Sequence, residues 1–235
     1  MIIDQYFSEP NGNVCFTREQ GSQFAKQMAD DFNPLHDIDA TRFCIPGDLL
    51  FAVILAKYGI SQHMEFMFSG MVVAGVQLFM PEPAEEMYIN DEEGKEYLRV
   101  KRTGGLSHDE ILLQNLTQSY VQFSGQTFPH ILVPLLAEKN VMIHPDRPLV
   151  IYQSMSIDLD SLDVKQPVLR GDYNKLEVNG KRGSVELAFH LEDNGEVVGR
   201  GKKHMLVTGL RAYDEGVARD AVSTYNDSKM AFSAP

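Results

Sequence analysis

The chain has 235 residues, of which 43% are hydrophobic and 23% are charged, a mixture typical of a folded protein rather than a disordered one. Its formal net charge of −12 repels nucleic-acid phosphates and anionic membrane surfaces, so we expect neither as a partner. The two cysteines form no disulfide framework and no zinc pattern, which favours a reducing, cytoplasmic location without a metal or other cofactor. Residues 1–11 lack the features of a signal peptide, and the most apolar window, Phe66–Met80, is too short for a membrane helix.

Two helices are predicted in the first sixty residues or so. Thr17 begins a capping box, and apolar residues at helical spacing follow it, which predicts an amphipathic helix over Thr17–Phe32 that ends before Pro34. Pro46 suits the first position of the second helix, predicted over Ile45–Gly59. This second helix is apolar on all sides, so it must be buried on all sides.

The remaining chain is mostly strand-like, apart from a further apolar helix predicted over Phe128–Asn140, which Pro134 would kink. The turns Asn179-Gly180 and Asp193–Gly195 indicate hairpins, and such short connections favour antiparallel pairing. Residues 211–235 are predicted to form a polar tail with at most a short helix. The predicted strands are His63–Pro81, Glu85–Asn90, Lys95–Thr103, Glu110–Ser124, Pro148–Leu159, Val168–Val178, Gly183–Glu192 and Val197–Leu210.

The order of elements is apolar helix, strands, apolar helix, strands. It predicts an α+β fold in which an antiparallel sheet wraps around buried helices. The same order suggests a weak duplication of the architecture, with one half over residues 1–125, another over 126–210, and the tail over 211–235.

One stretch carries residues suited to chemistry, Asp31-Phe32-Asn33-Pro34-Leu35-His36, followed by Ile45-Pro46-Gly47-Asp48-Leu49-Leu50. Pro34 stiffens the bend, so a carboxylate and an imidazole can be held facing one point and can share a proton across a water molecule. Pro46 and Gly47 open the buried helix, where free backbone amides can receive a developing oxyanion and glycine allows close approach.

The segment Asp31–His36 resembles the Asp-x-Asn-Pro-Ile/Leu-His signature of the MaoC-like, (R)-specific enoyl-thioester hydratases of the hotdog superfamily, and Ile45–Leu50 is similar to their second motif. The resemblance implies a bacterial lyase of fatty acid metabolism with a hotdog fold, here a double hotdog. Asp31 and His36 would add water to an enoyl-CoA or enoyl-ACP thioester, or remove it. Asn33 would orient the loop or the thioester, and Pro46 and Gly47 would bind the thioester carbonyl. A homodimer is also possible.

The sequence departs from this pattern at three places, and alternatives stay open. Asp30 precedes Asp31, so either carboxylate could point inward, and the spacing from His36 to Gly47 is short. Asp48 would weaken the oxyanion site if it faced inward. The alternatives are a hotdog thioesterase that uses Asp48, a non-catalytic protein that binds an acyl ligand, and a plain helix-ending turn. Cys44 is expected to be a small buried thiol rather than a nucleophile.

Overall fold

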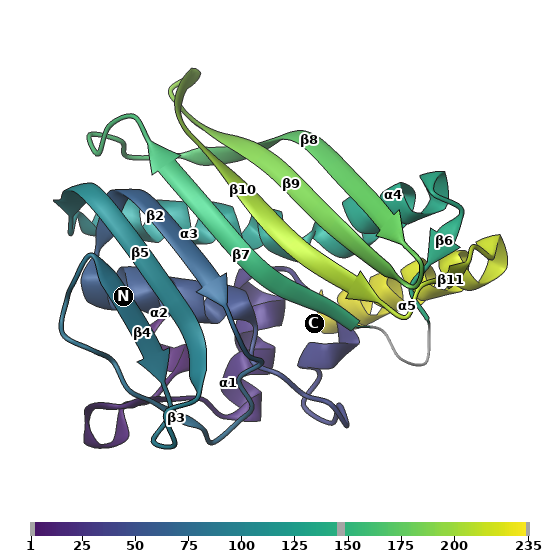
Figure 1. The fold of residues 1–235 in the computed structure, drawn as a ribbon, viewed down its shortest axis with the longest axis horizontal. Helices are drawn as coiled ribbons and strands as arrows, with labels where there is room; N and C mark the ends of the chain where they lie inside the picture. Colours follow the sequence, from purple (N-terminus) through teal and green to yellow (C-terminus); the bar gives the residue numbers. More distant parts are fainter. Residues whose placement is uncertain (1–2, 145–148, 234–235) are drawn as a thin grey trace.

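The computed structural model describes residues 3–144 and 149–233, and its main feature is one seven-stranded sheet. All neighbouring strands in this sheet run antiparallel, in the order β4-β5-β2-β7-β10-β9-β8, which Figure 1 shows from one edge to the other. The α+β architecture with a large antiparallel sheet is therefore confirmed. The strands are β2 Ile60–Phe68, β4 Glu86–Asn90, β5 Glu96–Ser107, β7 Leu149–Leu159, β8 Val168–Asn179, β9 Arg182–Asp193 and β10 Glu196–Thr208.

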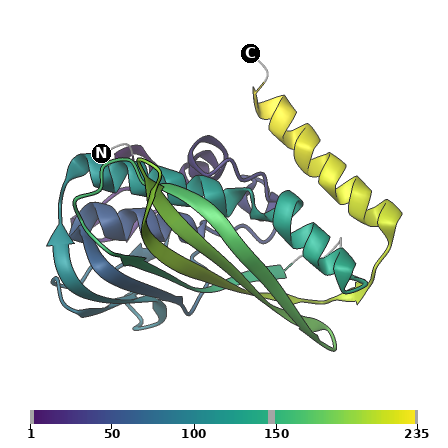
Figure 2. The same ribbon diagram turned by 90° about the horizontal axis from the view of Figure 1, so that it is seen from above.

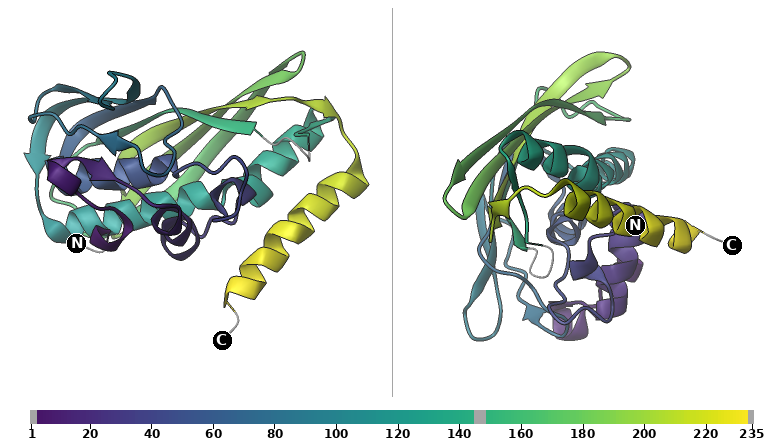
Figure 3. Two further views of the ribbon diagram at one scale, coloured as in Figure 1. Left: turned by 90° about the horizontal axis from the view of Figure 1, so that it is seen from below. Right: turned by 90° about the vertical axis from the view of Figure 1, so that its right-hand side faces the viewer.

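Two helices, α2 (Gly47–Tyr58) and α3 (Glu110–Gly125), lie side by side against the concave face of the sheet (Figures 2 and 3). α2 is the predicted apolar helix, and it is buried on all sides, with Leu49, Phe51 and Leu55 fully inaccessible. Burying one such side chain contributes about 1.5–3 kcal/mol, so this helix contributes strongly to the stability of the core. It ends at Gly59, which has a positive φ of 74°.

α3 corrects the prediction of a strand over Glu110–Ser124. Its buried residues come in pairs four positions apart, which is the period of a helix rather than of a strand. Asp109 begins the helix, because its carboxylate accepts a hydrogen bond from the Leu112 amide at 2.9 Å. Buried helix positions are Leu112, Leu113, Leu116, Thr117, Tyr120, Val121, Ser124 and Gly125.

The helix predicted over Phe128–Asn140 exists but is not the second central helix. It consists of a π-helical turn, Phe128–Leu132, followed directly by α4 (Val133–Glu138), so the change from π-helical to α-helical geometry lies next to Pro134, where a kink was predicted. Its apolar residues pack on the far end of β8, β9 and β10, in a second and smaller core. The sequence alone could not distinguish this end position from a central one, because both bury apolar helix faces.

The first helix is shorter than predicted. α1 covers Arg18–Gln23 behind the capping box of Thr17, and a π-helical turn, Phe24–Met28, follows it. The helical segment therefore stops before Asp30, which has a positive φ of 54°. Short 3-10 turns at Asp4–Tyr6, Pro10–Gly12 and Pro34–His36 complete this part of the chain.

The polar tail is another correction, because residues Glu215–Ser233 form a nineteen-residue helix, α5. Figure 3 shows that α5 runs back from the end of the sheet across the side where the N-terminal segments lie. Its buried residues, Ala218 and Tyr225, are seven positions apart on one face. That apolar face is narrow, and the sequence as a whole is polar, so the pattern indicated a tail.

Several strand boundaries also differ from those predicted. β2 is much shorter than His63–Pro81, since the chain leaves the large sheet after Phe68. The next strand, β3 (Gln77–Leu78), pairs with β1 (Val14–Cys15) in a separate two-stranded sheet. β5 runs on through Gly104 to Ser107. Pro148, where the next strand was predicted to begin, lies outside the described residues. A last short pair joins β6 (Val141–Met142) to β11 (Arg211–Ala212), and none of the described helices is apolar over a length that could span a bilayer.

The topology repeats. In each half a central helix precedes a strand at the middle of the sheet: β2 follows α2 directly, and β7 follows α3 after α4 and β6. These two middle strands pair antiparallel. In each half the last long strand, β5 or β10, lies beside that middle strand, and the earlier strands lie outside it. The helices α2 and α3 are therefore equivalent in the two halves. The start of α2 and the end of α3 line the same cavity, which is described below.

Candidate functional site

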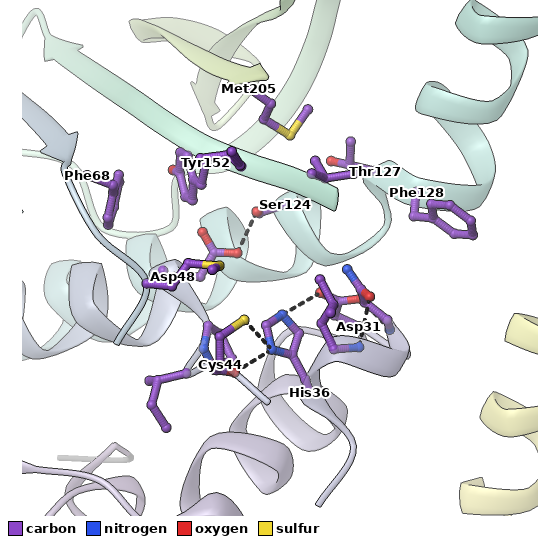
Figure 4. Close-up of a pocket in the computed structure, with 18 of the residues that line it drawn as sticks. Asp31, His36, Cys44, Asp48, Phe68, Ser124, Thr127, Phe128, Tyr152 and Met205 are labelled. Atoms are coloured by element: carbon purple, nitrogen blue, oxygen red, sulfur yellow. Dashed lines mark hydrogen bonds and ion pairs between the residues drawn. The ribbon is translucent and has the colours of Figure 1, made fainter. Parts of the chain in front are cut away.

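A cavity of about 370 Å³ lies where the 31–47 loop, the start of α2, the end of α3 and strands β7 and β10 meet (Figure 4). It is called the central cavity below. Five residues singled out from the sequence line it, namely Asp31, Asn33, His36, Pro46 and Gly47. Its volume is within the range of small-molecule sites, roughly 300–1,000 Å³.

The backbone at Asp30 decides which of the two adjacent carboxylates faces the cavity. The positive φ of Asp30 reverses the chain after the π-helical turn, and the Asp31 amide closes that turn by donating to the Ala25 carbonyl at 2.8 Å. Asp31 consequently points into the cavity, whereas the Asp30 carboxylate forms an ion pair with Lys229 of α5. The alternative that the sequence left open is thereby resolved in favour of Asp31.

Asp31 and His36 lie against one another in this cavity. His36 Nε2 is 3.7 Å from Asp31 Oδ2, and His36 Nδ1 is 2.9 Å from the backbone carbonyl of Cys44. Because a carbonyl only accepts, Nδ1 carries a hydrogen and donates it, and Nε2 is left to exchange a proton with Asp31 or with a ligand. Figure 4 shows the ring held between these two partners.

The surroundings of the pair shift both protonation equilibria. Burial lowers the pKa of His36, but its contacts with the Cys44 side chain, Asp31 and the Cys44 backbone outweigh that effect and raise the pKa to about 9. Burial raises the pKa of Asp31, and the nearby His36 charge opposes this change. At neutral pH the histidine therefore holds the proton, so it can act as an acid while the carboxylate acts as a base.

Asn33 and Pro34 shape the bend rather than face a reacting group. The Asn33 side chain accepts a hydrogen bond from the Leu35 amide at 3.1 Å, and the Asn33 amide donates to Asp31 Oδ1 at 2.9 Å. Pro34 begins the 3-10 turn that carries His36. Through these two hydrogen bonds Asn33 orients the Asp31 carboxylate with its backbone amide and stabilises the Pro34–His36 turn with its side chain.

The start of α2 supplies backbone donors to the same cavity. Pro46 is the N-cap and provides no side-chain acceptor, and the amides of Gly47 and Asp48 have no acceptor among the residues that the structure describes. These amides can therefore receive an oxyanion. Gly47 is also required by packing, because a Cβ there would lie 2.8 Å from Cδ1 of Tyr152.

A second charged cluster, Asp48, Ser124 and Lys203, lies in the same cavity. Ser124 Oγ donates to Asp48 Oδ2 at 2.5 Å and accepts from Lys203 Nζ, which is 4.0 Å from Asp48 Oδ1. All three side chains are buried, and Lys203 Nζ also lies 4.1 Å above the ring of Tyr152. Asp48 does face inward, but the Lys203 ammonium compensates its charge, so the carboxylate need not weaken the amide site.

Ser124, Lys203 and Tyr152 are site residues that the sequence analysis did not find. Ser124 was hidden by the prediction of a strand in place of α3. A signal did exist for Lys203, because it follows Gly199 and Gly201 on the inward face of a predicted alternating strand, where a lone lysine is rare.

Cys44 also lines the central cavity. Cys44 is buried as expected, and its Sγ lies 4.0 Å from His36 Nδ1. Within residues 3–144 and 149–233, no three histidine, cysteine or acidic side chains are grouped to hold a metal ion.

Comparison with solved structures finds similarity to a MaoC-like dehydratase, at 11% identity and a TM-score of 0.44, over 87% of this chain and 98% of that one. The tesB protein of Mycobacterium avium subspecies paratuberculosis is similar at 10% identity and a TM-score of 0.43, over 72% and 89% of the two chains. Acyl-CoA thioesterase II TesB2 from Mycobacterium marinum is similar at 11% identity and a TM-score of 0.40, over 92% and 99%. No curated protein matches the sequence.

A family model matches residues 1–216. The match includes the loop with Asp31 and His36, both central helices and every strand of the large sheet, and it ends as α5 begins. The description of that family is "Protein of unknown function (DUF3581)". Because the match covers most of the sequence, the chain belongs to the DUF3581 family.

Proposed function

We propose that the protein is an acyl-thioester hydratase or dehydratase that acts on enoyl-CoA or enoyl-ACP thioesters. The observation that carries this proposal is the pair formed by Asp31 and His36, 3.7 Å apart on the wall of a cavity that also contains the free amides of Gly47 and Asp48. A base, an acid and an oxyanion site are the three elements that addition of water to an enoyl thioester requires.

In the hydration direction, the Asp31 carboxylate takes a proton from a water molecule and the water oxygen forms a bond to C3. The electron pair of the C2–C3 double bond moves toward the thioester carbonyl, whose oxygen is stabilised by the amides at the start of α2. The Nε2–H of His36 then gives its proton to C2, and the proton on Asp31 returns to His36. Dehydration is the same sequence in reverse, and no cofactor takes part.

The protonation state of the pair supports these roles. With a pKa of about 9, His36 is an imidazolium at neutral pH and can donate from Nε2 while Nδ1 stays bound to the Cys44 carbonyl. The cavity as a whole holds two carboxylates, Asp31 and Asp48, opposite two cations, His36 and Lys203. The charges of His36 and Lys203 oppose the rise that burial causes in the pKa of Asp31.

The test is an assay with crotonyl-CoA that follows both enoyl absorbance and free thiol. We expect absorbance to fall without release of thiol, and Asp31→Asn and His36→Gln to lower the rate by about 10²–10⁴, the usual contribution of a general acid or base. Asp30→Asn is the matched control, since this neighbouring carboxylate pairs with Lys229 outside the cavity, and its rate should equal the parent's. An inactive parent protein, or a fully active Asp31→Asn variant, would contradict the proposal.

The second candidate is a thioesterase, and the state of Asp48 favours it. Its Oδ1 is buried in the central cavity without a hydrogen-bond partner, 4.0 Å from Lys203 Nζ. A carboxylate in this position could direct water at the thioester carbonyl, and hydrolysis would release a free thiol. In the same assay, thiol release that Asp48→Asn abolishes and Asp31→Asn leaves unchanged would select this function over the first.

We also propose that the fold is a double hotdog, in which each central helix and its strands form one half. The support is the repeated order of α2 with β2, β4 and β5, and of α3 with β7 to β10. In this proposal the two halves divide before α3, at residues 108–109, whereas the sequence pattern predicted a division after residue 125. One chain then contains both halves of a site, with Asp31 and His36 from the first and Ser124 and Lys203 from the second.

A further inference from the structure

A second cavity, also of about 370 Å³, lies between α5 and the body of the protein, and we call it the α5 chamber. Its walls come from the Phe32–Leu35 bend, from residues Met142–His144 and from one face of α5. Nothing in the chemistry proposed above uses this space.

The lining of the α5 chamber is mainly apolar. Side chains that face it include Phe32, Phe128, Met142, Ile143, Val217 and Ala221. Three polar residues that α5 contributes, Asp220, Thr224 and Ser228, are exposed, so they form its edge. The fourth, Tyr225, is buried, and its hydroxyl is hydrogen-bonded to the Phe32 amide. An occupant should therefore be a hydrocarbon group and not a phosphate or a peptide.

The α5 chamber adjoins the central cavity. Four residues line both spaces, namely Asn33, Leu35, Phe128 and Val150. In Figure 4, Phe128 stands on the side of the central cavity that faces α5. These shared side chains form the boundary between the two cavities, so an acyl chain that starts beside Asp31 has to pass them to reach the chamber.

α5 is attached to the same loop that carries Asp31. The Tyr225 hydroxyl accepts from the Phe32 amide at 3.1 Å and lies 3.1 Å from the Asp30 carbonyl, to which it can donate. The Phe32 ring also packs edge-on against Tyr225, with their centroids 6.0 Å apart. The helix that forms one wall of the α5 chamber is thus hydrogen-bonded to the loop that carries Asp31.

From this arrangement we propose that the α5 chamber binds the hydrocarbon tail of a medium- or long-chain acyl thioester whose reacting end lies in the central cavity. The inference rests on the proposed function for the identity of the reacting end. The occupant follows from the apolar lining and from the wall shared with a cavity in which the Gly47 and Asp48 amides can bind a thioester carbonyl. Each methylene buried there should improve binding about fourfold, since it contributes about 0.8 kcal/mol.

The experiment compares crotonyl-CoA with trans-2-dodecenoyl-CoA, and it also measures direct binding of cis-parinaric acid, a fluorescent long-chain fatty acid. Ala221→Trp places a large ring in the chamber, whereas Ser223→Trp, on the same helix but exposed and outside the lining, is the matched control. We expect Ala221→Trp to lower kcat/KM for the dodecenoyl substrate by on the order of tenfold or more and to weaken parinaric acid binding equally. The crotonyl reaction and both properties of Ser223→Trp should stay at the parent's values.

The two assays separate this inference from the proposed function. Parinaric acid binding that Ala221→Trp abolishes, in a protein that turns over neither thioester, would support the chamber and reject the hydratase. Turnover of crotonyl-CoA with no gain for the longer chain and no effect of Ala221→Trp would support the hydratase and overturn the chamber. Equal loss of crotonyl activity in Ala221→Trp would also overturn it, because the variant would then disturb the reacting end.

Discussion

Replacing Lys203 by Met removes a buried charge from the central cavity while keeping most of the side-chain volume. Lys203 is 5% exposed, and its Nζ lies 4.0 Å from Asp48 Oδ1, an atom with no hydrogen-bond partner. Two unit charges at that distance attract by about 4 kcal/mol at an effective dielectric constant of about 20. Removal of one partner of a buried pair generally costs about 3–5 kcal/mol, because the other charge stays buried and uncompensated.

We therefore expect Lys203→Met to lower the free energy of unfolding by about 3–5 kcal/mol and the melting temperature by about 6–20 °C in a chain of this size. Urea denaturation of the parent, Lys203→Met, Asp48→Asn and the double variant forms a complete cycle. The double variant should recover much of the loss, because it leaves no unpaired charge. A loss below about 1 kcal/mol in Lys203→Met, or strictly additive losses in the double variant, would refute a buried, compensated pair.

Three further predictions follow from single positions. Gly125→Ala should strongly destabilise the protein in thermal melts, because a Cβ there would collide with the Ala29 carbonyl oxygen, and a parent-like melt would contradict that packing. Protonated His36 should stabilise the fold fully below pH 6.5 and lose this effect as the pH rises through about 9. The difference in unfolding free energy between the parent and His36→Gln should therefore shrink over that pH range. A difference that stays constant would show that His36 protonation does not stabilise the fold. Tyr225→Phe should cost about 1–3 kcal/mol in urea denaturation by leaving the Phe32 amide buried without its acceptor, and no cost would place α5 away from the bend.

Local rules in the sequence were sufficient for several features. The apolar run after Pro46 predicted the buried α2, because a helix without a polar face has to be enclosed. The turns at Asn179-Gly180 and Asp193–Gly195 predicted the hairpins of β8, β9 and β10, where Gly180 and Gly195 have the positive φ that such turns require. Asp31 and His36 were found because the proline bend and the helix start are both local signals.

Two helices were missed, one because a local pattern was misread and the other because it depends on contacts with distant parts of the chain. The strand predicted in place of α3 was an error of period, since polar glutamines and serines among the apolar residues of 110–125 obscured the helical spacing. α5 was predicted as a polar tail because only Ala218 and Tyr225 of its nineteen residues are buried. Its position depends on partners nearly two hundred residues away, such as Asp30 and Phe32.

The sequence by itself predicted that Asp31 and His36 form a candidate acid–base pair and that one apolar helix has to be enclosed, because both follow from neighbours within a few residues. Only the tertiary structure decided that Ser124 and Lys203 join Asp48 beside that pair, since these three side chains come from α3, β10 and α2. It also decided the existence of the α5 chamber, because a cavity is the space left between elements and no local pattern of residues specifies that space.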